Sequence, residues 1–521
     1  MFSTNSLLYI TRATVVNRFY KKIFFVKYSA FFLKMTCRLK KCVLQYSEYL
    51  LEEAKNMYTK NVNMLQGPIA PGLLRITVPI MVMQVLQSIF NIIDMSVLKM
   101  ADSSGGYAVG AVGSCSMLIT LITVLLTGLA SGSNVVIARH IGSGDKERVD
   151  RAVGTALVVS VVGGFLLLII GVLFAEVFLS WTNCPSELMH DATLYFRLYF
   201  VSVPVIMIYN FAAAIIRSNG NSKSPMIYLS LGGVVKVLMN IVFVAFFNMG
   251  VVGLALATLI SFSFSSILAI RKLLIGEGVI KIKKEYLRIY TSELKEIVFI
   301  GVPSGLQSAF YSIANVIITA TVNKYGPDAS TGISIANNFD GILYNITFAP
   351  SLAVMAYASQ NIGHKNVKRA EKSILAGIMI TVAFGVTFGS LSAIFSRQLS
   401  SIMTNSAAAI EYSHQKMIII STTYFICGIN EIMCAAMRAM RRPIVSTVTT
   451  LIYMCLFRFI WVYVFFPLCP NFTFLFLVWP VGWVLSISTI LVFYIPTVRR
   501  LRREYRSADA QTAAESAPSY Y

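Results

Sequence analysis

A short stretch of this sequence occurs twice, 221 positions apart. Residues 141–151 read IGSGDKERVDR and residues 362–372 read IGHKNVKRAEK. Each copy is an Ile-Gly turn that leads into a charged helix start, and each lies between two long apolar segments. This spacing is far longer than the unit of a solenoid, which is about 20 to 50 residues, so it indicates two homologous halves. Paired halves in a very apolar chain are typical of secondary transporters.

The composition predicts a membrane protein. The 521 residues are 56% hydrophobic and 13% charged, whereas about 25% of the residues are charged in a typical soluble domain. The apolar runs exceed about 18 residues, which is the length that crosses a bilayer core. We predict an all-α polytopic membrane protein with twelve spans, at residues 72–97, 110–134, 152–178, 192–216, 225–247, 250–270, 297–322, 332–359, 374–396, 415–437, 444–466 and 473–497.

The net charge of +21 follows the predicted sides of the membrane. The loops after the even-numbered spans and the C-terminal tail hold 25 Lys and Arg residues. The opposite loops hold only four: Lys99, Lys324, Arg397 and Lys416. Basic residues concentrate on the cytoplasmic side, so we expect both termini in the cytoplasm and the chain in the cell membrane. The charge is thereby explained by topology, and we expect no nucleic-acid partner.

The two halves have the same orientation. Arg217, which closes the fourth span, matches Arg438 at an offset of 221. Each half contains six spans, an even number, so both enter the membrane in the same direction. We predict two parallel six-helix lobes, residues 64–275 and 297–503, related by a pseudo-two-fold axis along the membrane normal. Residues 276–296 form a cytoplasmic linker.

We predict that the two chain ends are not part of the lobes. Residues 1–63 are basic and poor in acids, which fits an interfacial arm, a targeting segment, or a stretch that is not translated because synthesis starts at Met57 or Met64. Residues 504–521, rich in Ala and Ser, are predicted to be disordered.

Several function classes lack their signatures. The eight Cys include no CxxC pair and the four His lie near span ends, so no metal or disulfide site is expected. No nucleophile or His/Asp cluster lies within a span, and no filter motif repeats. We therefore predict a carrier that is not an enzyme or a channel and needs no cofactor.

An ordered set of motifs resembles the MATE (multidrug and toxic compound extrusion) family, in particular its NorM-like and DinF-like bacterial members. The motifs are MLQGPI at 64–69, Gln84, Gln87, Asn91 and Asp94, GLASG at 128–132, IRSNG at 216–220 and MGVVGLALAT at 249–258. The resemblance covers about residues 64–503. It implies export of organic, often cationic, compounds in exchange for H+ or Na+.

Asp94 is the first candidate for ion coupling. It lies within the first span, with Asn91 one turn earlier on the same face. A carboxylate within a span is costly, and protonation removes its charge, so its protonation state can bias the packing of the lobe. The resemblance implies that Asp94 is the cation-coupling acid of the family. A fixed ion pair is the alternative.

The resemblance also implies an Asn-x-x-x-Asp motif on the fifth span and a Thr on the sixth. Asn240 and Thr258 match, but Val244 replaces the second acid, and Lys236 stands one turn before Asn240. One carboxylate beside a fixed ammonium suits Na+ poorly. We therefore hypothesise that Asp94 pairs with Lys236 when ionised and that H+ is the coupling ion, with Na+ at Asp94 as the alternative.

Candidate substrate-contacting residues are polar groups within apolar spans: Gln84, Gln87, Gln307, Asn315, Asp340 and Glu431. Asp340 and Glu431 favour a cationic substrate. The alternatives are structural pairing with Arg458 or Arg438, and hydrogen bonds between helices.

We predict a monomeric multidrug efflux antiporter for small drug-like molecules, which works by alternating access of its two lobes. The alternative is a flippase for lipid-linked oligosaccharides from the same wider superfamily.

Overall fold

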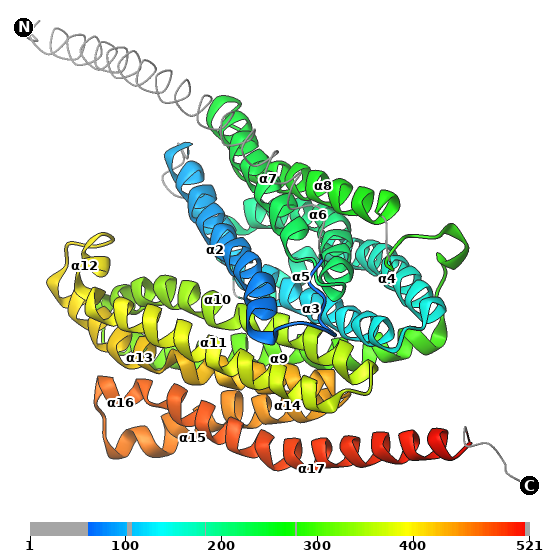
Figure 1. Ribbon diagram of the computed structural model, residues 1–521. Coiled ribbons are helices and arrows are strands. Elements are labelled where there is room, and N and C mark those ends of the chain that lie inside the picture. The colour runs from blue at the N-terminus through cyan, green and yellow to red at the C-terminus, as the bar shows by residue number, and fades with distance from the viewer. Residues whose placement is uncertain (1–60, 102–106, 183, 277–278, 516–521) are drawn as a thin grey trace, which may run out of the picture. The chain divides into compact units, whose positions relative to one another are not determined.

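The computed structural model describes residues 61–101, 107–182, 184–276 and 279–515. Residues Val62 onward form one compact unit. Nearly all of the predicted N-terminal extension, 1–63, lies outside the described residues. The described part is built from helices, most of them longer than 25 residues (Figure 1).

Six long helices form the first lobe. They are α2 (Ile69–Ala101), α3 (Tyr107–Ser143), α4 (Lys146–Leu173), α6 (Ser186–Ser218), α7 (Lys223–Asn240) and α8 (Gly250–Ile275), with the short α5 (Ala175–Trp181) between α4 and α6. The second lobe repeats this order. It comprises α9 (Thr291–Asn323), α10 (Pro327–Gly363), α11 (Val367–Ile394), α12 (Ser396–Ser401), α13 (Ala407–Ala439), α14 (Pro443–Thr450), α15 (Phe457–Ile460), α16 (Phe472–Phe476) and α17 (Val478–Glu515).

Four pairs of helices have the same length in both lobes. The pairs α2 and α9 and α6 and α13 have 33 residues each, α3 and α10 have 37, and α4 and α11 have 28. The helix after each Ile-Gly turn is capped in the same way. Asp145 Oδ1 accepts from the backbone N–H of Arg148, and Asn366 Oδ1 accepts from that of Arg369, both at 3.0 Å. Such N-caps satisfy a helix donor that would otherwise lack a partner. The repeat in the sequence is therefore a repeat in the structure.

The two Ile-Gly turns meet on the pseudo-axis. A Cβ on Gly142 would lie 1.9 Å from the carbonyl oxygen of Gln360, and a Cβ on Gly363 would lie 2.1 Å from that of Arg139. Gln360 is the counterpart of Arg139, as Gly363 is of Gly142, so the contact is reciprocal, as a two-fold axis requires. We call this end of the two lobes the turn end.

Glycines also allow the lobes to pack side by side. Gly128 and Gly132 of α3 face Gly305 and Gly301 of α9, with a Cβ on Gly128 only 2.2 Å from the backbone nitrogen of Gly305. Small residues let helix backbones approach closely within a membrane. In the second lobe, α10 makes the corresponding contact with α2 of the first lobe. A Cβ on Gly72 of α2 would lie 2.3 Å from the hydroxyl oxygen of Tyr357 of α10.

Wide turns interrupt two helices. A π-helical segment, Ile241–Phe246, directly follows α7, and two more, Leu451–Leu456 and Trp461–Phe465, flank α15. A π turn is rare and often lies at a functional site. The predicted eleventh span, 444–466, is thus a distorted helix.

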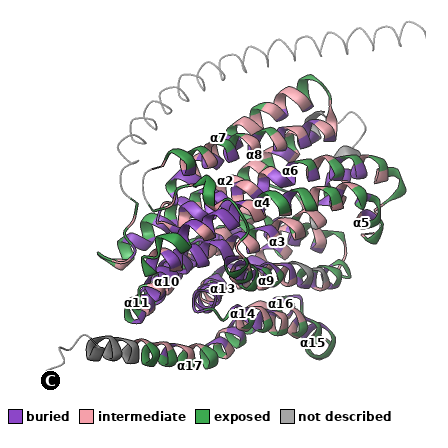
Figure 2. Ribbon diagram, turned by 90° about the vertical axis from the view of Figure 1, so that its right-hand side faces the viewer, coloured by how far each residue is buried: buried purple, intermediate pink, exposed green. Residues whose placement is uncertain are grey.

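The outer surface is apolar, as a lipid-facing surface must be. Leu166, Ile169 and Leu173 of α4 are each more than half exposed, while α10 and α13 are buried along most of their length (Figure 2). A soluble protein rarely exposes so much continuous apolar surface.

The twelve predicted spans correspond to helices of the structure. Eleven helical segments among the described residues are long and apolar enough to cross a membrane. The remaining predicted span, 297–322, lies within the 33-residue helix α9, the counterpart of α2. Two expectations need correction. The predicted linker 276–296 ends earlier, because α9 begins at Thr291, and residues 504–515 of the predicted disordered tail continue helix α17.

Gly142→Ala tests the reciprocal contact. The new Cβ cannot be accommodated against a backbone carbonyl, so we expect a destabilisation of about 1 to 3 kcal/mol and a lower thermal midpoint in detergent. Gly113→Ala is the control, since no atom lies within 4 Å of its Cβ position. Equal midpoints for the two variants would contradict the close approach of the turns.

Candidate functional site

A buried ion pair lies inside the first lobe. Lys236 Nζ of α7 donates to Asp94 Oδ2 of α2, and Asn240 Nδ2 donates to Asp94 Oδ1 at 2.5 Å. Asp94 is 5% exposed and Asn240 is fully buried. The contact between Asp94 and Lys236 that the sequence suggested is therefore present. Both oxygens of one carboxylate are bound by side chains of a single neighbouring helix.

The local backbone places these side chains. Lys236 and Asn240 lie one turn apart on the last two turns of α7, and the π-helical segment starts at the next residue, Ile241. Val244, which stands where the family motif has an acid, is fully buried within that segment. The apolar Val leaves Asp94 as the single carboxylate of this cluster among the described residues.

Two other predicted members lie apart from the pair. Thr258 is buried, but its hydroxyl donates to the Leu254 carbonyl of its own helix at 3.0 Å. Asn91 is exposed on α2. The predicted cation-coupling residues thus divide into three that meet, Asp94, Lys236 and Asn240, and two that do not bind Asp94.

A second buried ion pair lies inside the second lobe. Lys416 Nζ of α13 lies 2.8 Å from Asp340 Oδ2 of α10 and also donates to Asn337 Oδ1. Lys416 is 3% exposed, although it was predicted to lie in a loop. That assignment is wrong, because α13 starts at Ala407 and carries Lys416 into the lobe. The partner of Asp340 is therefore Lys416 and not Arg458 or Arg438.

The remaining predicted polar residues take several roles. Glu431 is buried, and Arg438, two turns later on α13, is the positive charge that acts on it. Gln307 is buried and its Oε1 has no partner among the described residues, as is also true of Gln84 Oε1. Gln87 is half-buried on α2.

Arg458 has an unusual environment for a buried cation. It is 1% exposed, and its Nη1 donates to Asn315 Oδ1 of α9 at 2.6 Å. Its guanidinium lies over the rings of Tyr311 and Trp479, 5.1 and 4.9 Å from their centres. Among the described residues no carboxylate forms an ion pair with it, and its Nη2 has no hydrogen-bond partner. Arg458 and Asn315 were each predicted as candidate residues within spans, but the contact between them was not predicted.

Polar contacts close the turn end between the lobes. Glu296 of α9 lies 3.6 Å from Arg139 of α3 and 2.6 Å from Arg441, and Glu293 lies 3.1 Å from the Nε2 of His140. Arg139 also donates to the Ala439 carbonyl at 3.0 Å. These groups were not predicted as interlobe contacts, because nothing in the sequence shows which loop residues face each other across the axis.

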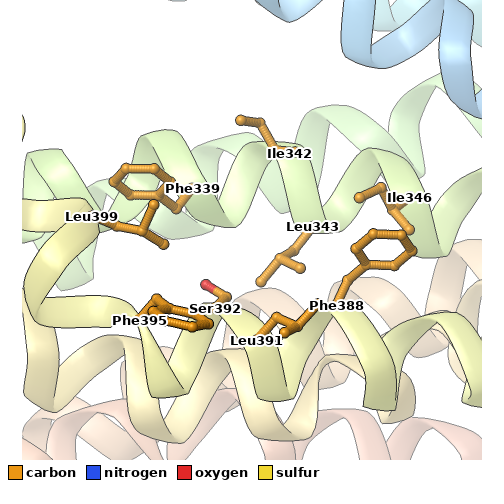
Figure 3. Close-up of a pocket in the computed structure, with 9 residues that line it drawn as sticks. All are labelled: Phe339, Ile342, Leu343, Ile346, Phe388, Leu391, Ser392, Phe395 and Leu399. Atoms are coloured by element: carbon orange, nitrogen blue, oxygen red, sulfur yellow. The ribbon is translucent and has the colours of Figure 1, made fainter.

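An apolar groove of about 420 Å³ lies between α10 and α11 and extends to α12 (Figure 3). Its lining includes Phe339, Leu343, Phe388 and Phe395, and Ser392 is its one polar lining residue. It contains none of the predicted site residues. Without a charged group it offers apolar contact alone.

The chain matches a known family over both lobes. The family model described as MatE matches residues 79–242 and again 303–464. The two matches together cover more than half of the chain, and each lobe contains one of them.

Individual proteins are similar as well. The probable multidrug resistance protein YoeA of Bacillus subtilis is 26% identical over 370 residues, covering 70% of this chain and 79% of YoeA. A protein of Shewanella oneidensis named FAD transporter is 22% identical over 397 residues, covering 74% and 86% of the two chains. A solved MATE family transporter in an outward-facing conformation superposes with a TM-score of 0.78 at 20% identity and covers 86% of this chain and 99% of its own.

The buried ion pair makes a stability prediction. Lys236→Met leaves the Asp94 charge buried without its ammonium, and we expect a loss of about 3 to 5 kcal/mol. Lys236→Met combined with Asp94→Asn removes both charges and should recover most of that loss, as measured by thermal unfolding in detergent. Arg197→Met, which breaks an exposed pair with Glu176, serves as the control and should cost about 1 kcal/mol or less. A double variant that is no more stable than Lys236→Met would contradict the pairing.

Proposed function

The chain belongs to the MatE family, and we propose that it is a multidrug efflux antiporter that exports organic compounds in exchange for H+. The observation that supports H+ as the coupling ion is the contact of Asp94 with Lys236 and Asn240 inside the first lobe. The named multidrug relatives support efflux over the flippase alternative.

Protonation of Asp94 supplies the energy for a conformational change. The neutral carboxyl no longer attracts the ammonium of Lys236, which then lies half-buried without a counter-charge. Breaking a buried pair in this way costs about 3 to 5 kcal/mol. Moving a two-state equilibrium from 1:99 to 99:1 requires about 5.5 kcal/mol. One protonation therefore supplies a large part of the free energy needed to shift α2 and α7 to another packing.

The same geometry favours H+ over Na+. Both Asp94 oxygens are already bound by Lys236 and Asn240, so a sodium ion would have to displace a fixed ammonium. A proton needs only one carboxylate oxygen. Release of Lys236 on protonation gives the two states that coupling requires, with no second acid.

The contacts at the turn end support alternating access. Glu296 and Glu293 connect the lobes there through Arg139 and His140, and the basic loops assign this end to the cytoplasm. A lobe arrangement closed at the cytoplasmic end suits release of substrate to the outside. The multi-pass chain would lie in the cell membrane with both termini inside.

The charge of the substrate is a separate question. The expectation of cationic compounds rested on Asp340 and Glu431, and each of these carboxylates has a cation of the protein acting on it. The relative named FAD transporter, by contrast, carries an anionic compound by its name. We propose small amphipathic organic molecules as substrates.

Asp94→Asn tests the coupling. In proteoliposomes with an imposed pH gradient, we expect it to abolish driven transport, because the amide cannot exchange a proton, while substrate binding in detergent persists. Asp150→Asn is the matched control, since Asp150 also pairs with a lysine, Lys283, but at the turn end. It should retain most of the driven transport.

A sodium gradient at clamped pH gives the decisive comparison. We expect no transport above the level without a gradient. Transport driven by Na+ alone, or full activity of Asp94→Asn under a pH gradient, would refute proton coupling at this site.

A further inference from the structure

Arg458 is a buried charge that forms no ion pair with a carboxylate of the described residues. Among the described residues, Asp94 pairs with Lys236, Asp340 with Lys416 and Glu293 with His140, while Arg438 acts on Glu431. The hydrogen-bonding neighbours of Arg458 are neutral: Asn315 accepts from Nη1, and the Tyr311 side chain lies within reach of the guanidinium. Its Nη2 has no partner among the described residues. An unpaired buried charge is costly, so its retention requires an explanation.

Asn315 connects Arg458 to the space between the lobes. One face of α9 carries Gly301 and Gly305, which touch α3 of the other lobe. The same face continues along the helix with Asn315, Thr319 and Asn323, all exposed. The exposed apolar residues Phe299, Val302 and Leu306 lie on another face. The polar stripe of Asn315, Thr319 and Asn323 therefore faces the other lobe and not the lipid.

The surroundings of the guanidinium are aromatic. Tyr311, beneath Arg458, stacks on Tyr344 with ring centres 6.3 Å apart, and Tyr344 stacks on Phe348 at 5.3 Å. Trp479 lies on the α17 side of the cation. Tyr311, Tyr344 and Trp479 are partly exposed. Stacked rings of this kind accept a further planar ring.

The backbone around Arg458 is also distorted. π-helical segments lie directly before and after α15, which holds Arg458 over α9. In Figure 1, α14 to α17 lie together on one side of α9 and α13. A regular helix in their place would turn Arg458 to a different angle, so the wide turns position this side chain.

We propose that Arg458 binds an anionic group of the transported compound, with the attached aromatic ring against Tyr311 and Tyr344. The anion takes the place of the Asn315 amide oxygen on Nη1 and occupies the free Nη2, in the fork geometry that guanidinium offers to carboxylates and phosphates. Asn315 satisfies the cation while no substrate is bound. This inference rests on the proposed efflux function and names its substrate class as aromatic anions.

The test uses two dyes with the same ring system and opposite charge. Fluorescein is anionic, and rhodamine 123 is cationic, on a shared xanthene skeleton. Binding to the purified full-length protein in detergent is measured by fluorescence anisotropy. Asn315→Asp places a carboxylate on Arg458 and should weaken fluorescein binding by about tenfold or more. Rhodamine 123 binding should be unchanged or tighter.

Two further variants separate binding from folding. Asn323→Asp makes the same charge change two turns away on the same stripe and should leave fluorescein affinity within about twofold, since its new charge is remote from Arg458. Asn315→Ala frees the guanidinium and should bind fluorescein at least as tightly as the natural chain. A purely structural role for Asn315 would instead weaken both dyes in both Asn315 variants.

The outcomes distinguish this inference from the proposed function. No fluorescein binding by the natural chain, or equal binding by Asn315→Asp, overturns the anion site even if a pH gradient drives rhodamine 123. Binding of fluorescein that depends on Asn315, with neither dye driven by the gradient in proteoliposomes, supports the anion site and overturns proton-coupled efflux.

Discussion

The cost of burying charge between helices organises this protein. Asp94 and Asp340 are each less than a tenth exposed, and each is neutralised by a lysine within the same lobe. Neither of these two pairs crosses between the lobes, so a movement of one lobe relative to the other leaves both pairs intact. Two ion pairs do cross between the lobes at the turn end. Arg139 with Glu296 is partly exposed, whereas His140 with Glu293 is buried, so the first pair is the less costly to separate.

Glycine sets how closely the lobes approach. The α3 and α9 backbones touch at Gly128 and Gly305, and the two turns interlock through Gly142 and Gly363. Small residues provide contact area without long side chains that must be ordered, so helices joined in this way pack at little cost in rotamer freedom. Lobes with internal ion pairs that meet at closely packed glycines suit the proposed alternating access.

The sequence predicts the scaffold well because its signals are long and repeated. Runs of apolar residues define the spans, and the 221-residue offset predicts the pairing of α3 with α10 and of α4 with α11. Asp94 and Lys236 were found because a charge stands out within an apolar run. Lys416 was missed because it lies one residue inside the predicted span, at the boundary where sequence periodicity is least informative.

The contact of Arg458 with Asn315 could not be derived from the sequence. Helical periodicity tells which residues share a face, but the π-helical segments on both sides of α15 change the phase of the helix. The direction of Arg458 therefore depends on how this distorted helix packs on α9. The apolar groove between α10 and α11 likewise depends on the packing of two helices and carries no polar motif.

The two lobes share a scaffold but not their chemistry. Helices α6 and α13 start 221 residues apart, so the counterpart of Lys416 is Tyr195. Helices α7 and α14 start 220 residues apart. At that offset Leu456 corresponds to Lys236, and Leu238 corresponds to Arg458. Because these positions carry different groups, neither the two ion pairs nor the Arg458 contact is repeated at the equivalent place in the other lobe. The symmetric scaffold gives the two halves matching helices, and the asymmetric placement of charge suits the proposed division, in which one half responds to protons and the other contacts the transported compound.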